Sequence, residues 1–203
     1  MAINPLEQAK IEAAFAAAQQ RTQAPILCVL ARASANYEIA PLLWSGLLAL
    51  ATPWPLLIFT QLSAQRIFIA QLLVCLAAMV ILSLIPQRSL LTPARVRRAH
   101  AHRAALAQFA LRGLERAPGR NGVLIYVSLA ERYARVIAAD AAAQAIAQRQ
   151  WQGLIDALVA DLRGGDAAQA LAKAAEACAG LLAPAFPATG DPAPQHRQHF
   201  HFM

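Results

Sequence analysis

Two long stretches without a charged residue, residues 39–65 and 67–87, limit most strongly what this chain can form. Each is long enough to cross the hydrocarbon core of a bilayer, which takes about 20 predominantly apolar residues. A hydrophobic hairpin buried inside a soluble protein is the alternative, but two segments of this length exceed what a small core can enclose. The sequence therefore predicts a transmembrane helical hairpin over residues 39–87. Its first span should be irregular or kinked, because it contains Pro41, Pro53 and Pro55.

The composition also favours a membrane protein. Hydrophobic residues make up 58% of the chain and charged residues only 14%, whereas soluble domains carry about 25% charged residues. The first residues, MAINPLEQAKIEAAF, include Glu7 and Glu12 and have no basic segment leading into an apolar one. They do not form a secretory signal, so we expect the N-terminus to begin in the cytoplasm.

The three cysteines, Cys28, Cys75 and Cys178, are far apart and odd in number. This spacing predicts small apolar side chains in the core or facing lipid, in a reducing compartment, rather than a disulfide framework.

The arginines are distributed unequally around the two spans. The loop between the spans carries Arg66 alone, whereas a basic cluster follows the second span. The cluster consists of Arg88, Arg95, Arg97, Arg98 and Arg103. Because arginine accumulates on the cytoplasmic side, we expect both termini in the cytoplasm, with two spans crossing the membrane. The cluster is expected to contact anionic lipid headgroups, at about 1 kcal/mol per arginine.

The segments on either side of the hairpin have the signals of a mixed α/β domain. A helix is predicted from Asn4-Pro5-Leu6-Glu7, followed by a buried strand over residues 25–31. After a helix that opens at Thr92-Pro93, strands over residues 123–128 and 133–138 are predicted to form an antiparallel hairpin. Two helices follow, the first with an apolar stripe over residues 151–162 and the second over residues 166–181.

Residues 1–38, which contain the strand at residues 25–31, are too few to form a hydrophobic core alone. We therefore predict that residues 1–38 and 92–187 form one split domain, which requires both pieces on the same side of the membrane. An even number of spans satisfies that requirement. The polar, proline-containing tail at residues 188–203 is expected to be disordered.

The strand pair resembles the core of the TPM domain family. The similarity lies in Asn121-Gly-Val-Leu-Ile-Tyr-Val-Ser128, followed by a Glu131-Arg132-x-x-x-Val136 strand. More narrowly, the chain resembles the bacterial membrane-protein branch in which a two-span hairpin splits the domain. The resemblance implies a TPM-like α/β sandwich interrupted by a transmembrane helical hairpin. It also implies either phosphatase or metal-binding activity, or a role in the assembly or repair of membrane complexes.

The resemblance points to Asp140 and Glu131 as the candidate metal ligands, for a divalent cation. The family's acidic residue near the start of the domain is missing here, and the segment after the second strand is Asp140-Ala-Ala-Ala-Gln144. A hydrolytic metal site needs several oxygen ligands around one ion. The alternative is that both carboxylates are surface charges near turns.

Other chemistry is less well supported. His100 and His102 diverge by about 200° on a helix and cannot chelate one ion together. The tail histidines, His196, His199 and His201, could bind a metal only adventitiously. No aromatic residue lies between Arg88 and Arg103, which argues against nucleic-acid binding.

The leading hypothesis, in line with the resemblance, is a bacterial-type integral protein of the inner membrane. Its cytoplasmic TPM-like domain would serve as a non-enzymatic module for interaction, or for assembly and maintenance of membrane complexes. No cofactor is predicted for it. The expected partners are a bilayer with anionic headgroups and another membrane protein or a second copy of the chain. The competing hypothesis is a membrane-tethered metal-dependent phosphatase, and a third is regulation by lipid binding through the basic helix.

Overall fold

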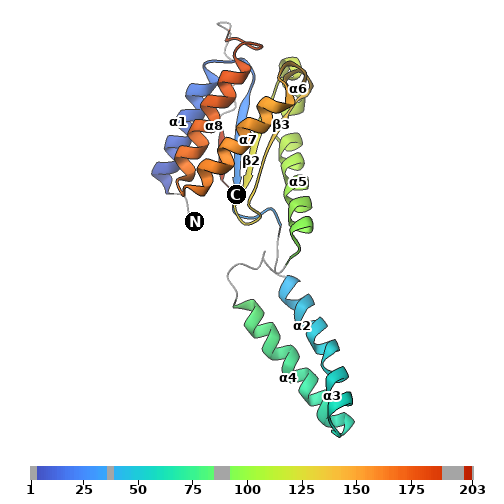
Figure 1. The fold of residues 1–203 in the computed structure, drawn as a ribbon. Coiled ribbons are helices and arrows are strands. Elements are labelled where there is room, and N and C mark those ends of the chain that lie inside the picture. The colour runs from blue at the N-terminus through green and yellow to red at the C-terminus, as the bar shows by residue number, and fades with distance from the viewer. Residues whose placement is uncertain (1–3, 36–38, 85–91, 189–198, 203) are drawn as a thin grey trace. The chain divides into compact units, whose positions relative to one another are not determined.

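The computed structural model describes residues 4–35, 39–84, 92–188 and 199–202 (Figure 1). The chain divides into two compact units. The first consists of Met1–Ser34 and Ala101–Met203, and the second of Ala35–His100.

A four-stranded sheet forms the centre of the first unit. Its strands are β1 (Ile26–Ala31), β2 (Val123–Ser128), β3 (Tyr133–Ala138) and β4 (Phe200–Phe202), in the order β3-β2-β1-β4. β1 pairs in parallel with β2 and β4, whereas β2 and β3 are antiparallel. The three strands and the β2–β3 hairpin predicted from the sequence are confirmed. Every residue of β1 and β2 is buried, because both strands have a neighbour on each side and helices on each face.

Helices cover both faces of this sheet (Figure 1). One face packs against α1 (Pro5–Gln19), α7 (Gln148–Arg163) and α8 (Ala167–Leu182). The opposite face packs against Ala105 and Phe109 of α5 (Ala94–Leu111) and against Leu114. Leu114 belongs to η2 (Leu114–Arg116), and the remaining short helices are η3 (Pro118–Arg120) and α6 (Asp140–Ala145). The predicted mixed α/β fold is thus confirmed, and the structure adds that its helices lie on both faces of the sheet.

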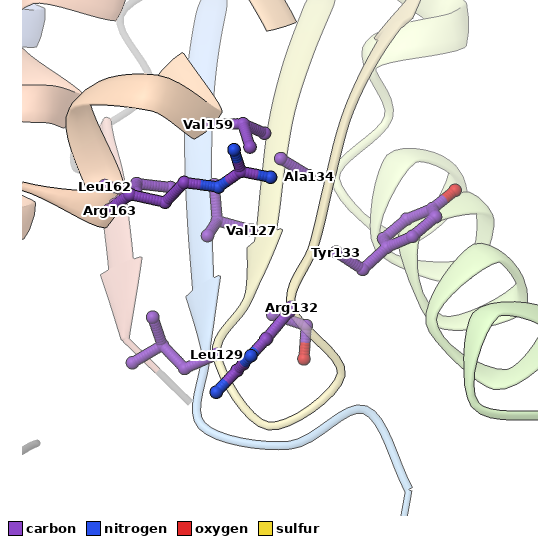
Figure 2. Close-up of a pocket in the computed structure, with 9 residues that line it drawn as sticks. Val127, Leu129, Arg132, Tyr133, Ala134, Val159, Leu162 and Arg163 are labelled. Carbon is purple, nitrogen blue, oxygen red and sulfur yellow. The ribbon is translucent and has the colours of Figure 1, made fainter. Parts of the chain in front are cut away.

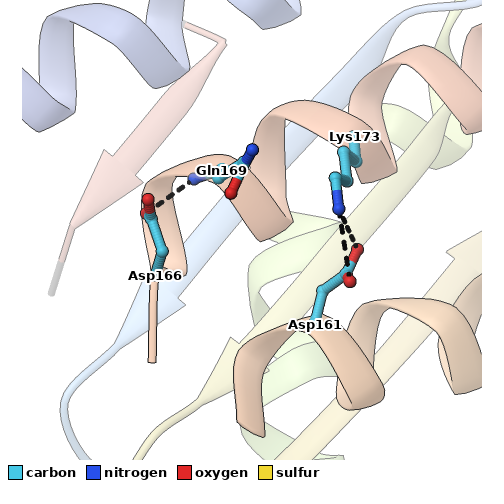
Figure 3. A network of polar contacts seen from close by, with 4 residues as sticks. All are labelled: Asp161, Asp166, Gln169 and Lys173. Atoms are coloured by element: carbon cyan, nitrogen blue, oxygen red, sulfur yellow. Dashed lines mark hydrogen bonds and ion pairs between the residues drawn. The ribbon is translucent and has the colours of Figure 1, made fainter. Parts of the chain in front are cut away.

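The predicted helix ends have the expected caps. The Asn4 backbone N–H donates to Glu7 Oε2 at 2.9 Å, which completes a capping box at α1. At α8, Asp166 Oδ1 accepts from the Gln169 N–H at 2.9 Å (Figure 3). An ion pair of 3.3 Å between Lys173 and Asp161 joins α8 to α7, but its half-exposed position limits its contribution to under about 1 kcal/mol.

The second unit contains the two apolar stretches as helices. The first stretch is broken at Thr52 into α2 (Ile39–Ala51) and α3 (Pro53–Phe59), as its prolines predicted. The second forms α4 (Ala64–Ser83). The small residues Ser45 and Ala49 are buried one turn apart in this unit, and small side chains are what allow membrane helices to approach closely.

Both stretches are long and apolar enough to cross a membrane. The first candidate span, Ile39–Phe59, has a mean hydropathy of 1.7 with 11% of its most apolar window buried, and the second, Ala64–Ser83, has 2.3 with 6% buried. The Thr52 and Ser45 hydroxyls donate to carbonyl oxygens of their own helix, Leu48 O at 2.8 Å and Leu42 O at 2.9 Å. Such bonds satisfy polar groups where water is absent.

The prediction of a disordered tail is wrong for its last residues. Phe200–Phe202 form β4, paired with Cys28 to Leu30 of β1. Phe200 is buried in the main core and Phe202 packs against it. The two phenylalanine side chains and the backbone hydrogen bonds to β1 hold this segment on the sheet. The polar residues before it made the strand hard to predict from the sequence. Residues 189–198 of the predicted tail lie outside the described residues.

Candidate functional site at the carboxyl ends of the parallel strands

A group of polar side chains gathers where β1 and β2 end, which we call the Glu131 cluster. It consists of Ser34, Tyr126, Ser128 and Glu131. The Ser34 backbone N–H donates to Glu131 Oε1 at 2.8 Å, and the Ser128 hydroxyl donates to Glu131 Oε2. The Tyr126 and Ser34 hydroxyl oxygens are 2.9 Å apart and share a hydrogen bond.

Glu131 is only 6% exposed, so its carboxylate depends on these donors. Burial raises the pKa of the Tyr126 phenol, and the nearby Glu131 charge acts in the same direction. The hydrogen bonds of this cluster connect the segment after β1 to the hairpin after β2. Glu131 therefore has a structural role, in which its carboxylate is shielded from solvent.

The structure does not bring the two predicted metal ligands together. Glu131 precedes β3 and Asp140 follows it, and a six-residue strand is about 20 Å long. Asp140 is exposed and forms an ion pair of 2.5 Å with Arg120. One ion therefore cannot contact both carboxylates. Within residues 4–35, 39–84, 92–188 and 199–202, no group of three or more His, Cys, Asp or Glu side chains could hold a metal ion.

A pocket with two arginines lies beside the Glu131 cluster, and we call it the arginine pocket. Its volume is about 480 Å³. It is lined by Val127, Ser128, Leu129, Arg132, Tyr133, Ala134, Val159, Leu162 and Arg163. Figure 2 shows Arg163 extending from α7 toward Ala134 and Arg132 coming from the hairpin, whereas the Tyr133 ring points away toward α5. Neither arginine forms an ion pair with a carboxylate in the described part of the chain.

Arg132 adopts an unusual backbone conformation for its residue type. Its φ of +50° lies in the left-handed region, which favours glycine or asparagine. Residues that hold such a strained conformation cluster at functional sites.

A second hollow, of about 510 Å³, runs along β3 between α5 and α7, and we call it the edge groove. All six β3 residues line it, together with Leu106, Ala143, Gln148, Trp151, Gln152 and Ile155. Trp151 is 5% exposed, and its indole N–H has no hydrogen-bond partner in the described structure. Arg135, the exposed residue of β3, donates to His102 Nδ1 at 3.0 Å.

The predicted basic cluster is mostly on α5. Arg95, Arg98 and Arg103 are exposed and Arg97 is half-buried, while Arg88 lies outside the described residues. His102 contacts Arg135 of β3.

His199 and His201, the two tail histidines that the structure describes, lie at β4. The Glu12 carboxylate accepts the backbone N–H groups of His199 and Phe200, each at 2.7 Å. The Cys28 N–H donates to the His199 carbonyl at 2.8 Å. His201 is part of β4, whereas His196 is outside the described residues.

The cysteines are free thiols, as predicted. Burial raises the pKa of Cys178 to about 12, and it raises that of Cys28 further, with help from the Glu12 charge. Both are protonated at neutral pH and are not nucleophiles.

With this geometry in view, the chain can be compared with known proteins. The family model of the TPM domain matches residues 91–181, from just before α5 almost to the end of α8. This chain carries a TPM domain. Its fold also resembles the NMR structure of BA42 protein from the psychrophilic bacterium Bizionia argentinensis, with a TM-score of 0.61 and 13% sequence identity. The match covers 100% of this chain and 97% of BA42. No curated protein is significantly similar in sequence.

The Asn121-Gly122 pair of the TPM domain has a steric explanation here. A Cβ atom at Gly122 would lie 2.5 Å from the backbone oxygen of Leu114. Residue 122, just before β2, must therefore be glycine, because the chain passes close to the backbone of Leu114 in η2 at this point. This pair belongs to the predicted resemblance, whereas Ser34, Ser128, Arg132 and Arg163 were not predicted as site residues. The only signal for them was the charge of the Glu131-Arg132 turn.

Proposed function

We propose that this protein is an integral inner-membrane protein whose cytoplasmic TPM domain acts as an interaction module, in the assembly or maintenance of membrane complexes, and not as an enzyme. One observation carries the membrane part. The two candidate spans leave most of their apolar surface uncovered, with only 11% and 6% of their windows buried. Apolar patches of that extent on a protein mark a protein or membrane interface.

The other kinds of apolar helix fit less well. A helix from a soluble core would be largely buried. A signal sequence would stand at the N-terminus, whereas here α1 and the fully buried strand β1 precede the first span. Exposed leucines on α2 and α4, such as Leu43, Leu47 and Leu73, suit contact with lipid tails.

The cytoplasmic location is supported by the basic cluster. Arg88, Arg95, Arg97, Arg98 and Arg103 follow the second span, against Arg66 between the spans. These arginines would bind anionic headgroups. Because β1 and β2 share one sheet, the segments before and after the hairpin must be on the same side.

The non-enzymatic role is supported by how the chain uses its carboxylates. Glu131 is bonded to Ser34 and Ser128, and Asp140 to Arg120. The arginine pocket has donors for an anion but no carboxylate on its lining that could act as base or metal ligand.

Cysteine labelling can test the topology without removing the native thiols. Cys28 and Cys178 are buried and protonated, and Cys75 lies in a candidate span. Ser63→Cys places a thiol between the spans and Glu115→Cys places one on the TPM domain, both at exposed positions. In spheroplasts, a membrane-impermeant maleimide should label Ser63→Cys directly and Glu115→Cys only after lysis. The wild-type protein gives the background, and the reverse pattern would contradict the proposal.

A membrane-tethered metal-dependent phosphatase is the second candidate, because two unpaired arginines suit a phosphate group. The purified full-length protein should not hydrolyse p-nitrophenyl phosphate with Mg²⁺ or Mn²⁺. If the protein hydrolyses this substrate in a metal-dependent way and Asp140→Ala abolishes the activity, the phosphatase hypothesis replaces that of an interaction module.

A further inference from the structure

We propose that the open edge of β3 binds an extended acidic segment of a partner protein as an added strand. This inference rests on the proposed role as an interaction module, and it names the surface and the chemistry of its partner. The acidic segment would lie in the edge groove and reach the arginine pocket.

The backbone of β3 offers hydrogen-bonding groups on its outer side. The Ala139 N–H donates to Gly122 O at 2.8 Å, which fixes the alternation of the antiparallel β2–β3 ladder. Tyr133, Arg135 and Ile137 therefore direct their backbone groups toward β2. Ala134, Val136 and Ala138 direct theirs outward.

The outward groups of Ala134, Val136 and Ala138 make no backbone hydrogen bond with another element of the described structure. A row of free N–H and C=O groups is the template on which strand addition occurs.

The edge is also accessible along its length. The edge groove follows β3 between Leu106 of α5 and Trp151 and Ile155 of α7. The arginine pocket shares Tyr133 and Ala134 with this groove, so the two hollows are neighbours along the strand. Trp151, whose buried indole N–H has no partner in the described structure, also lines this groove.

β3 lacks most of the features that protect natural sheet edges. It has no proline and no bulge, since its six residues pair one to one with β2. Its single charge, Arg135, is bonded to His102 and Tyr133 instead of standing free across the edge.

The charges around β3 select an acidic partner. Arg132 and Arg163 lie in the arginine pocket at one end, and Arg135 lies within the strand. The carboxylates next to β3 are engaged, since Asp140 pairs with Arg120 and Glu131 is buried. A second copy of β3 would bring two sets of arginines together in a chain with a net charge of +7, which is unfavourable.

The test uses the protein in detergent micelles, with Trp44→Phe and Trp54→Phe so that Trp151 is the single tryptophan. Three synthetic peptides of eight residues are titrated. The first alternates Val and Glu, the second alternates Val and Lys, and the third is the Val-Glu peptide with N-methylated backbone at every second residue. The Val-Glu peptide should shift the Trp151 emission and saturate. The other two should bind at least tenfold more weakly, because they lose the charge match or the ladder.

Two protein variants locate the binding. Val136→Pro removes an outward N–H and leaves the β2–β3 ladder intact, so binding should fall at least tenfold. Arg163→Ala should weaken binding about fivefold, whereas Arg149→Ala, at an exposed position of α7 that lines neither hollow, should change it less than twofold. If Val136→Pro does not fold, the N-methylated peptide still decides the role of the ladder.

Equal binding of the Val-Glu and N-methylated peptides would overturn strand addition, and equal binding of the Val-Lys peptide would overturn the acidic partner. If anionic vesicles of phosphatidylglycerol shift the Trp151 emission and the Val-Glu peptide does not, the arginines serve lipid and the proposal fails. These outcomes are separate from maleimide labelling and phosphatase assays. If the Val-Glu peptide does not bind, while maleimide labelling gives the expected topology and no phosphatase activity is found, only the proposal for the β3 edge is rejected. The proposal of a membrane-bound interaction module then stands.

Discussion

Gly122 is a position where a single methyl group decides the packing of β2 against η2. A Cβ at this position would meet backbone atoms of Leu114 at 2.5 and 3.1 Å, and backbone cannot rotate away as a side chain could. Gly122→Ala should therefore lower the free energy of unfolding by about 1–3 kcal/mol. Urea denaturation followed by circular dichroism measures the change.

Gly180 provides the matched control for this substitution. It lies in α8 with open space around its Cα. Gly180→Ala should raise stability by about 0.5–1 kcal/mol, because alanine is the better helix former. Destabilisation of similar size in both variants would show that the close approach at Leu114 does not matter.

Arg132 allows stability and binding to be separated. Its left-handed backbone costs about 1 kcal/mol for a residue with a Cβ, which glycine avoids. Glycine also gains freedom in the unfolded chain, which offsets part of the benefit. Arg132→Gly should leave the free energy of unfolding unchanged within about 1 kcal/mol, while the affinity for the Val-Glu peptide falls. A variant that loses stability and keeps the affinity would contradict the role of the arginine pocket.

The buried thiols make stability depend on alkaline pH. An unfolded cysteine loses its proton around pH 9.0, whereas folded Cys178 keeps it up to a pKa of about 12. Between these values the folded state binds more protons than the unfolded state, so stability falls as the pH rises. From pH 8 to pH 10 the loss should be about 1 kcal/mol for Cys178, with Cys28 acting in the same direction. Cys178→Ala should reduce the loss in urea melts at the two pH values. An equal loss in the variant would assign it to other groups.

At the scale of elements, β4 depends on a carboxylate from the opposite end of the chain. Glu12 of α1 accepts both N–H groups at the start of β4. Hydrogen bonds to a charged group contribute about 1.5–3 kcal/mol. Glu12→Ala should release residues 199–202 from the sheet and speed hydrogen exchange of the Phe200 and Phe202 amides. Glu176→Ala, on the exposed side of α8, should leave that exchange unchanged.

The elements that the sequence predicted are those whose signals lie within one continuous segment. β1 and β2 are continuous apolar runs, and the helix caps at Asn4 and Asp166 depend only on residues next to them in the chain. β4 was not predicted because it has only three residues, and the alternation of apolar and polar side chains from Phe200 to Phe202 is too short to indicate a strand. The Glu131 cluster and the arginine pocket were missed for a different reason. They assemble residues from β1's end, the hairpin and α7, whose proximity depends on the sheet order and on helix packing.

At the scale of the whole molecule, the arginines after the second span should determine orientation. Replacing Arg95, Arg97 and Arg98 by Gln weakens the charge bias and leaves Arg66 unopposed by most of the cluster. We expect a measurable fraction of molecules in the inverted orientation, seen as maleimide labelling of Glu115→Cys in intact spheroplasts. Replacing Arg116, Arg149 and Arg163 by Gln is the control, because these positions lie farther along the chain from the spans. An orientation that stays uniform in the first variant would contradict the positive-inside argument.

The order of the strands also imposes an order of events on synthesis. β1 ends at Ala31, and β2, which shares its whole register, begins at Val123. At about 5–20 residues per second, the ribosome spends roughly 5–20 s between them. During that time it delivers the apolar hairpin, while the apolar residues of β1 have no neighbouring strand. The hairpin thus leaves the ribosome before the domain around it can close, and β4, which follows the other three strands in the chain, can pair with β1 only later still.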